Sequence, residues 1–426
     1  MLKRISPAQA ELGMFVHKLE GSWLKHPFWK SRFLLEDTAT LENLRHSEIE
    51  AVLIDVTKGR DIADAHPDGA PATSQTKQAA PQAEPIGRRR AIRRTEPFDF
   101  SSTQRTSAGR EFGHAQSVAK RAEKAISRVF LNARLGKAVN ASEVEPVIAE
   151  IFASVQRNPH AFNGLMRCKR DHHFAYQHAL AVSALMISLA RTMKLPPAQI
   201  RDAGMAGLLL DVGIGHLPID LDAVGGDYRG FDDAVLQAHT TLGYNYLQLG
   251  GDIPETVAQA ALQHHERVDG TGYPAGLRGD AISVLARMAA VCDTYDMLVT
   301  DGARTRGLDP AAAIVAMAEM PGRFDPLILA AFIEAIGAYP VGSVVRLASE
   351  QLALVIDQNP ADHRLPRVRT FYALATGQLT EPADLVLAHY FGSDRIIAQA
   401  DPAAYGIHDF AKLRLQIFAA DSQPAA

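Results

Sequence analysis

Two adjacent histidines followed by a carboxylate begin the stretch of this sequence with the clearest chemical potential. The stretch reads HHERVDGTGYPAGLRGD, from His264 to Asp280. Adjacent imidazoles are costly to pack side by side unless something joins them, and a metal ion does this well. The glycines that follow allow the backbone to turn tightly and to approach a ligand closely. The stretch therefore predicts a metal pocket beside a tight loop.

Other residues of ligand type lie within, or at the ends of, segments with helical periodicity. With the histidine pair they form this set: His178, Asp211, His239, His264, His265 and Asp293. A lone histidine in a helix is usually structural, but this many ligand-type residues favour a metal site. Imidazole and carboxylate suit Fe or Mn first, with Zn or Ni as alternatives. A central carboxylate can bridge two ions, and a metal pair can generate hydroxide and hold both oxygens of an in-line phosphate displacement. The set therefore predicts one or two divalent transition metals, and phosphodiester hydrolysis is chemistry that fits it.

The sequence from about residue 120 to 405 resembles the HD-GYP domains, the bacterial metal phosphodiesterases that open cyclic di-GMP. The resemblance is carried by the segments YQHALAV, LLLDVGIGHLP, AHTTLG, HHERVDGTGYP and ARMAAVCDTYDML, each of which contains one or more of the ligand-type residues. The segment AFIEAIGAYPVGSVVRL resembles the C-terminal extension of the same family. The resemblance implies a mainly α protein, an HD-type helical bundle, with a dinuclear metal site.

The resemblance also implies a role for individual residues. In the family the HD pair is a histidine followed by an aspartate, which falls at positions 210 and 211 of this sequence. One ion would be held by His178, the HD pair and Asp293. The other would be held by Asp211, His239, His264 and His265, with Asp211 as the bridge. The predicted catalytic carboxylates are Asp211 and Asp296. The loop predicted to bind a ligand or a partner protein contains Asp269, Gly270, Gly272, Tyr273 and Pro274. A rigid, exposed turn is the alternative interpretation of this loop.

Three positions depart from the pattern of the family. Leu210 replaces the histidine of the HD pair, Ile214 replaces a lysine that faces the scissile phosphate, and Gly302 replaces an arginine that grips phosphate. Losing a direct ligand should weaken metal binding by more than the roughly 10–100-fold typical of outer-shell changes. Each lost positive charge should remove a few kcal/mol of charge stabilisation in a dry site. His216 could replace the missing ligand, although a loop histidine in solvent is the preferred interpretation.

These substitutions favour a cyclic di-GMP signalling protein in which a degenerate phosphodiesterase acts as a binding or regulatory module. Its partners would be cyclic di-GMP and a diguanylate cyclase domain or another signalling protein. The protein partner would bind through the loop that contains Gly272, Tyr273 and Pro274, the GYP loop. The alternative is an active or weakly active metal-dependent cyclic di-GMP phosphodiesterase with an altered metal site. Non-hydrolytic di-iron chemistry, which other HD-type folds perform, is a third hypothesis. A homodimer is left open.

The elements that must position these residues follow from hydrophobic periodicity. Helical periodicity begins near Ser117 and continues with short Gly/Pro loops, which predicts a helical domain over residues 112–335. The resemblance implies that this is the HD-GYP domain. Strand periodicity in VGSVVRLASEQLALVIDQ and RVRTFYAL then predicts a β/α extension over residues 336–410. Residues 411–426 are predicted to be a frayed tail.

The N-terminal part reads differently. Residues 1–60 predict a small α+β domain with strands at Met14–Leu19 and Ala51–Val56 and a helix over Thr38–Glu50. This segment resembles the small N-terminal domain of unknown function that often precedes HD-GYP domains. An aromatic group is predicted to pack in a small core rather than to form a ligand platform: Trp23, Phe28, Trp29 and Phe33. Residues 61–111 are rich in Pro, Ala, Ser and Gln, which predicts a disordered linker, and an arginine run within it is interpreted as a solvated charge run.

Composition excludes several classes of protein. The chain has 426 residues, of which 47% are hydrophobic and 22% charged, as in ordinary globular proteins. The net charge of -4 gives no basic field for nucleic acid. No apolar run reaches the ~20 residues that span a bilayer, and the N-terminus lacks the apolar core of a signal peptide. We therefore expect a cytoplasmic protein without a membrane partner, with Cys168 and Cys292 reduced.

Overall fold

The computed structural model divides the chain into two compact units, Met1–Ile92 and Arg93–Ala426. The structure describes residues 2–20, 33–35, 38–45, 51–60, 106, 108–166, 174–220, 223, 226–302, 306–359, 361–389 and 394–419. Most of the predicted linker lies outside these residues, and so do its arginine run, Cys168 and three members of the predicted aromatic group, Trp23, Phe28 and Trp29.

The first unit is a four-stranded antiparallel sheet with one helix. Its strands are β1 (Leu2–Ile5), β2 (Phe15–Glu20), β3 (Phe33–Leu34) and β4 (Ala51–Asp55), in the order β1-β4-β2-β3, and its helix is α1 (Thr38–Arg45). Apolar side chains of β2, β4 and α1, among them Val16, Ile54 and Leu44, are fully buried together. The strands β2 and β4 and the helix α1 confirm the α+β prediction for this segment.

The second unit is mainly a bundle of helices. Its helices up to the C-terminal sheet are α2 (Ala108–Arg134), α3 (Ala141–Arg157), α4 (Ala161–Met166), α5 (Phe174–Thr192), α6 (Pro197–Leu209), α7 (Asp233–Gln248), α8 (Glu255–Gln263), α9 (Val284–Val299), α10 (Pro310–Ala318) and α11 (Pro326–Ile336). The mainly α prediction is confirmed. None of the helices that the structure describes is both long and apolar enough to cross a membrane.

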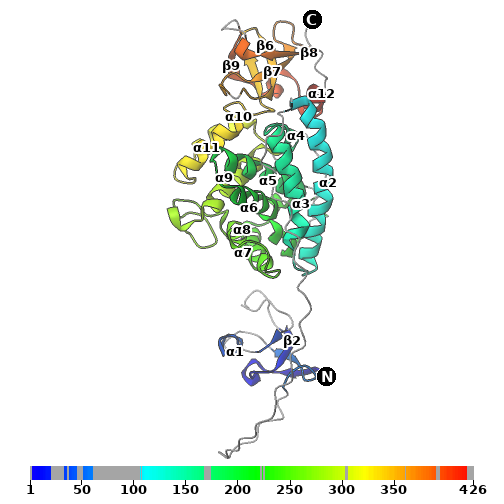
Figure 1. Ribbon diagram of the computed structural model, residues 1–426, viewed down its shortest axis with the longest axis vertical. Coiled ribbons are helices and arrows are strands. Elements are labelled where there is room, and N and C mark those ends of the chain that lie inside the picture. Colours follow the sequence, from blue (N-terminus) through cyan, green and yellow to red (C-terminus); the bar gives the residue numbers. More distant parts are fainter. Residues whose placement is uncertain are drawn as a thin grey trace, which may run out of the picture. The chain divides into compact units, whose positions relative to one another are not determined.

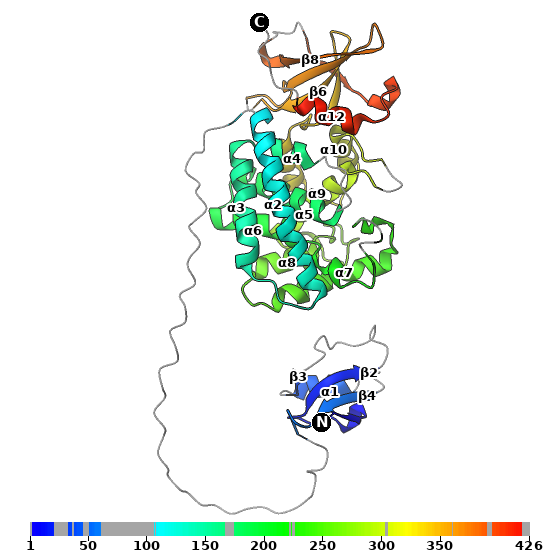
Figure 2. The same ribbon diagram turned by 90° about the vertical axis from the view of Figure 1, so that its right-hand side faces the viewer.

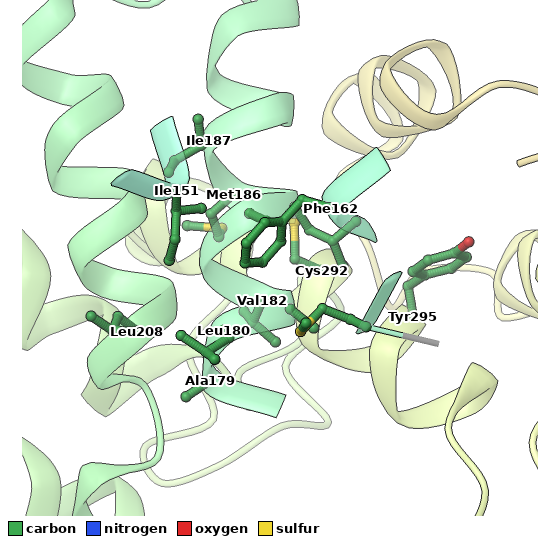
Figure 3. Close-up of a cluster of buried hydrophobic side chains, with 14 of the residues drawn as sticks. Ile151, Phe162, Ala179, Leu180, Val182, Met186, Ile187, Leu208, Cys292 and Tyr295 are labelled. Carbon is green, nitrogen blue, oxygen red and sulfur yellow. The ribbon is translucent and has the colours of Figure 1, made fainter. Parts of the chain in front are cut away.

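Helix α5 lies at the centre of this bundle (Figures 1 and 2). Every residue from His178 to Ala190 is buried, because the helix is apolar on all sides and packs against α2, α3, α4, α6, α9 and α11. Figure 3 shows this core, in which side chains of α5 lie among Ile151, Phe162 and Leu208 from three other helices. The central helix gives the metal-ligand candidate His178 a rigid support.

Helix α2 begins earlier than predicted. It includes residues 108–111, which the sequence composition places in the linker. Glu111 in its first turn is fully buried and accepts hydrogen bonds from Arg157 (2.7 and 2.9 Å) and Ser154 (2.7 Å) of α3. This buried, charge-assisted contact ties the start of α2 to α3, and no linear periodicity could reveal it.

The C-terminal part adds a five-stranded antiparallel sheet to the bundle. Its strands are β5 (Val344–Leu347), β6 (Gln351–Asp357), β7 (Arg367–Ala373), β8 (Gln378–Val386) and β9 (Ile396–Gln399), in the order β8-β7-β6-β5-β9. A final helix, α12 (Phe410–Ala419), occupies residues predicted to be a frayed tail. It is held by apolar contacts, because Phe418 is buried and stacks on Phe112 of α2 with ring centroids 5.1 Å apart.

Candidate metal centre

Asp211 lies where α6 ends and the short 3-10 helix η4 (Val212–His216) begins. The chain approaches α7 very closely here, since a Cβ atom at Gly213 would lie 2.0 Å from the backbone oxygen of His239. Only glycine fits such a position. This close approach brings the buried Asp211 carboxylate beside α7, with Oδ1 3.3 Å from His239 Nε2 and 3.5 Å from His264 Nε2. The glycine therefore sets the position of the central carboxylate.

Three histidines form the first group of candidate ligands. His239 of α7 and the pair His264 and His265 at the end of α8 each offer a ring nitrogen, and these atoms all lie within 4.8 Å of one another. His264 Nδ1 is 2.9 Å from the backbone oxygen of Ala261, and His239 Nδ1 is bonded to the backbone oxygen of Leu236. A carbonyl only accepts, which assigns the proton to Nδ1 in both rings.

With the proton on Nδ1, the neutral form of each ring carries its lone pair on Nε2. His239 Nε2 and His264 Nε2 are 3.2 Å apart, and both face Asp211 Oδ1. Such a convergence of acceptors is unfavourable unless a cation lies among them. Backbone-bonded imidazoles with converging Nε2 atoms and a carboxylate are the arrangement found around protein-bound metals. The donor set of this group fits a divalent transition metal.

His178, Asp211 and Asp293 form the second group, also within 4.8 Å of one another. His178 Nε2 lies 3.1 Å from Asp293 Oδ1 and 3.4 Å from Asp211 Oδ2. On the other side of the ring, Nδ1 is 2.8 Å from Asp296 Oδ2. Asp296 thus contacts the ring nitrogen opposite the cluster, as the carboxylate does in carboxylate–histidine–metal arrangements. The Asp211 carboxylate lies between the two groups, with one oxygen facing each.

The electrostatics agree with sites built for cations. Burial by itself lowers the pKa of the His178 imidazole, but hydrogen bonds to Asp293 and Asp296 outweigh it and raise that pKa well above its usual range. Burial raises the pKa of Asp211, but the neighbouring imidazoles of His239 and His264 outweigh it and hold that pKa well below its usual range. The cluster therefore keeps its negative charge and attracts a positive one, whether proton or metal.

His265 has a different environment from the other histidines. Its ring stacks on Tyr273, with centroids 4.7 Å apart and an interplanar angle of 26°. Burial lowers the pKa of His265 well below its usual range, and the neighbouring His264 and His239 lower it further. A ring that stays neutral is the form of histidine that binds metal.

The loop after the histidine pair is built onto it. Glu266 is buried, and its carboxylate accepts hydrogen bonds from the backbone nitrogens of Ala275 (2.7 Å) and Leu277 (2.9 Å). A Cβ atom at Gly272 would lie 2.4 Å from the backbone oxygen of His265, so only glycine allows this approach. The peptide bond between Tyr273 and Pro274 is cis. Sequence reasoning noted the Glu266 carboxylate but predicted no role for it.

The remaining predicted loop residues shape the turn itself. Asp269 accepts hydrogen bonds from the backbone nitrogen (2.9 Å) and the hydroxyl (2.6 Å) of Thr271. Gly270 has a φ of 79°, in the left-handed region that favours glycine. Pro274 is exposed at the tip. The loop is thus a compact turn with an exposed surface.

The three positions that depart from the family pattern carry apolar side chains in the core or, in one case, a glycine. Leu210 and Ile214 are each 1% exposed and belong to the main hydrophobic cluster, and Gly302 is half-buried just after α9. His216 is half-buried, with its ring centroid 5.0 Å from that of Tyr246. It belongs to neither ligand group among the described residues. The expectation of a loop histidine in solvent is therefore wrong, because the histidine packs against α7.

A tyrosine that sequence reasoning missed touches the centre of the site. The Tyr228 hydroxyl, from the 3-10 helix η6 (Tyr228–Gly230), donates a hydrogen bond to Asp211 Oδ2. Tyr228 is buried and meets Phe174 edge to face, and Phe174 stacks on His178. The surrounding sequence, GGDYRGF, has neither helical nor strand periodicity. No local signal could have found this contact, which only the folded chain creates.

Comparisons with known proteins agree with this arrangement. The profile of a family described as "Domain of unknown function (DUF3391)" matches residues 2–144, and that of a family described as "HD domain" matches residues 158–328. The chain is 39% identical over 399 residues to a cyclic di-GMP phosphodiesterase of Pseudomonas aeruginosa, a match that covers 93% of this chain and 92% of the relative.

Other matches are less identical or cover less of the chain. The chain is 33% identical over 140 residues to the cyclic di-GMP phosphodiesterase response regulator RpfG of Xanthomonas campestris, covering 32% of this chain and 37% of that protein. It is 17% identical to a solved structure, an HDG"Y"P protein from Bdellovibrio bacteriovorus, with a TM-score of 0.44 and coverage of 78% of this chain and 97% of that one.

The family predicted from the ordered motifs is confirmed by the HD-domain match and by the near-complete alignment with the Pseudomonas relative. The match to the domain of unknown function extends past the first unit, through α2 and into the start of α3 in the helical bundle. The chain belongs to the HD-GYP family of HD-domain proteins, whose relatives are named as cyclic di-GMP phosphodiesterases.

Proposed function

We propose that this protein is a metal-dependent phosphodiesterase that hydrolyses cyclic di-GMP. The observation that carries the proposal is the convergence of imidazole nitrogens and carboxylate oxygens on both sides of Asp211. These groups remain assembled although Leu210 replaces a predicted ligand. The near-full-length likeness to a named cyclic di-GMP phosphodiesterase supports the same substrate. The substitutions favour a degenerate, regulatory protein on sequence alone, whereas the assembled ligand groups support hydrolysis.

The residues of the site would divide their roles as follows. Asp211 Oδ1 and the three histidines of the first group would hold one ion, and Asp211 Oδ2 with His178 and Asp293 would hold another. A divalent ion such as Fe or Mn supplies Lewis acidity toward phosphate oxygens and lowers the pKa of water. Asp296 would orient His178 through Nδ1, and Glu266 would hold the loop against the histidine pair.

The two positions should differ in affinity. The first group offers three imidazoles and one carboxylate oxygen, whereas the second offers one imidazole and two carboxylate oxygens. Leu210 adds no donor to the second group. Each direct ligand contributes strongly to the affinity for a metal ion. We therefore expect one equivalent of metal to bind tightly at the three histidines and a second equivalent to bind more weakly at His178.

The proposal is tested with the full chain loaded anaerobically with Fe²⁺ or Mn²⁺. We expect cyclic di-GMP to be converted to linear product, measured by chromatography, and the Asp211→Asn variant to lose this activity by more than about 100-fold together with its bound metal. Asp280→Asn removes a highly exposed carboxylate elsewhere and should change neither quantity. A wild-type protein that binds metal but leaves cyclic di-GMP intact would contradict the proposal.

A regulatory function is the second candidate, and the buried, apolar Leu210 and Ile214 favour it. In that case the protein would bind cyclic di-GMP without hydrolysing it, and the exposed Pro274 surface would contact a signalling partner such as a diguanylate cyclase domain. The variant Leu210→His with Ile214→Lys and Gly302→Arg separates the candidates. Activity that appears only in this triple variant supports regulation, whereas activity already present in the wild type supports hydrolysis.

A further inference from the structure

The buried hydroxyl of Tyr228 contacts the one carboxylate that both ligand groups share. It donates to Asp211 Oδ2, the oxygen that also lies 3.4 Å from His178 Nε2. Asp211 Oδ1 faces the other way, toward His239 and His264. The phenol therefore touches Asp211 on the side of the second group, which Leu210 leaves with the fewest donors.

The neighbours of Tyr228 anchor it firmly. Arg229 donates to both carboxylate oxygens of Asp227 (2.8 and 2.9 Å) and to the backbone oxygens of Thr300 (3.0 Å) and Asp301 (2.7 Å), just after α9. Its guanidinium also lies 4.0 Å from the centre of the Phe174 ring, at the start of α5. We call residues 227–229 the strap. The strap therefore contacts both the segment that follows α9, the helix of Asp293, and the start of α5, the helix of His178.

Arg229 itself is an anchor rather than a phosphate-binding group. Its three guanidinium nitrogens are all engaged, two of them with Asp227, which balances the charge. The positive charge near Gly302 is therefore used to hold the chain. This leaves the Tyr228 hydroxyl as the part of the strap that contacts the shared Asp211 carboxylate.

We propose that Tyr228 is a positioning residue that orients the Asp211 carboxylate for the metal position at His178 and Asp293. The inference rests on the proposed metal site. An ionised carboxylate oxygen has more than one lone pair, so Oδ2 can accept from the phenol and still face a cation. The hydrogen bond restricts rotation of the carboxylate, which keeps Oδ2 toward His178 and Oδ1 toward the three histidines. Hydrogen-bonded partners of this kind typically contribute about 10–100-fold to metal affinity.

The test compares Tyr228→Phe with the wild type in a Mn²⁺ titration of the full chain, in which the electron paramagnetic resonance signal of free Mn²⁺ reports the binding of each equivalent. Phenylalanine keeps the ring that packs on Phe174 and removes only the donor. We expect the weaker equivalent to lose about 10–100-fold in affinity. The tighter equivalent should change by less than about threefold, because its other three donors are untouched.

Tyr246→Phe is the matched control. Tyr246 is also buried in the helical unit, and its hydroxyl donates to the backbone oxygen of Lys137 (2.8 Å), outside both ligand groups. This variant should leave both Mn²⁺ affinities unchanged. A loss that appeared equally in both variants would be a general effect of removing a buried hydroxyl and would overturn the assignment to Tyr228.

The outcomes distinguish this inference from the proposed function. If the wild type binds no Mn²⁺, the metal site and the positioning role both fail. If the wild type binds two equivalents and Tyr228→Phe binds both as tightly, only the positioning role fails. Should Tyr228→Phe not fold, Arg229→Gln releases the strap and keeps the phenol, and it should weaken the second equivalent in the same direction. An unchanged second equivalent in that variant would overturn the inference.

Discussion

The two ligand groups that share Asp211 are built in different ways. In the three-histidine group, His239 and His264 each bond through Nδ1 to a backbone carbonyl three residues earlier in the chain. In the second group, His178 is bonded to Asp293 and Asp296, which are more than a hundred residues away. One group therefore orients its rings locally, as each helix forms, and the other depends on the packing of α5 against α9. The geometry of the second group should therefore be the more sensitive to substitutions that alter helix packing.

The largest effect that separates the groups should come from removing one imidazole at a time. His264→Ala should abolish the tight metal equivalent, because the remaining rings cannot surround an ion. His178→Ala should abolish only the weak equivalent, because the three histidines keep their own set. Desalting removes the weak equivalent, so the metal content measured afterwards by mass spectrometry should be near zero in the first variant and one equivalent in the second, as in the wild type. Equal metal content in the two variants would break the comparison.

A smaller effect should follow from loosening the orientation of His178. Asp296→Asn keeps the shape of the side chain and removes the charge beside Nδ1. The affinity for the weak equivalent should fall by about 10–100-fold, with the tight equivalent unchanged. Calorimetric titration with Mn²⁺ measures both. Asp325→Asn is a suitable comparison, since Asp325 caps α11 and pairs with Arg287 without being among the proposed ligands. A drop in the tight equivalent alone would reverse the assignment of Asp296.

The smallest effect on metal affinity should come from destabilising the helical bundle at Glu111, which lies outside both ligand groups. Burial raises the pKa of Glu111, but hydrogen bonds from Arg157 and Ser154 outweigh it, so that its pKa is lowered when the chain folds. Glu111 therefore stabilises the fold above the pKa of the unfolded chain, about 4.3. That contribution is lost as the pH falls through the lower pKa of the folded state.

Glu111→Gln should accordingly reduce the free energy of unfolding by about 1–3 kcal/mol at neutral pH, and the difference from the wild type should shrink as the pH falls below about 4. Thermal unfolding of the metal-free protein, followed by circular dichroism across pH, measures this. Glu150→Gln, which affects an exposed pair with Arg121 between the same two helices, should cost about 0–1 kcal/mol. A difference for Glu111 that grew toward acid would contradict the assigned direction.

Much of the architecture could be predicted because its signals are local. Periodicity indicated the long helices, and Gly or Pro marked most of their ends. The histidine pair and the glycine loop could be recognised from their spacing in the sequence. The structure explains one of these glycines, because Gly272 allows a backbone approach that no other residue permits. The early start of α2 and the helix α12 were missed, because Glu111 and Phe418 order their segments through contacts distant in sequence.

The sequence by itself determined the family, the candidate ligands and the absence of a histidine at Leu210. Residue types and spacing carry that information, because a ligand must have the right chemistry before it can have the right position. Only the tertiary structure decided that one Asp211 oxygen faces each group, that Asp296 orients His178, and that Tyr228 reaches the shared carboxylate. These contacts join residues from separate elements, so they exist only once the helices have packed.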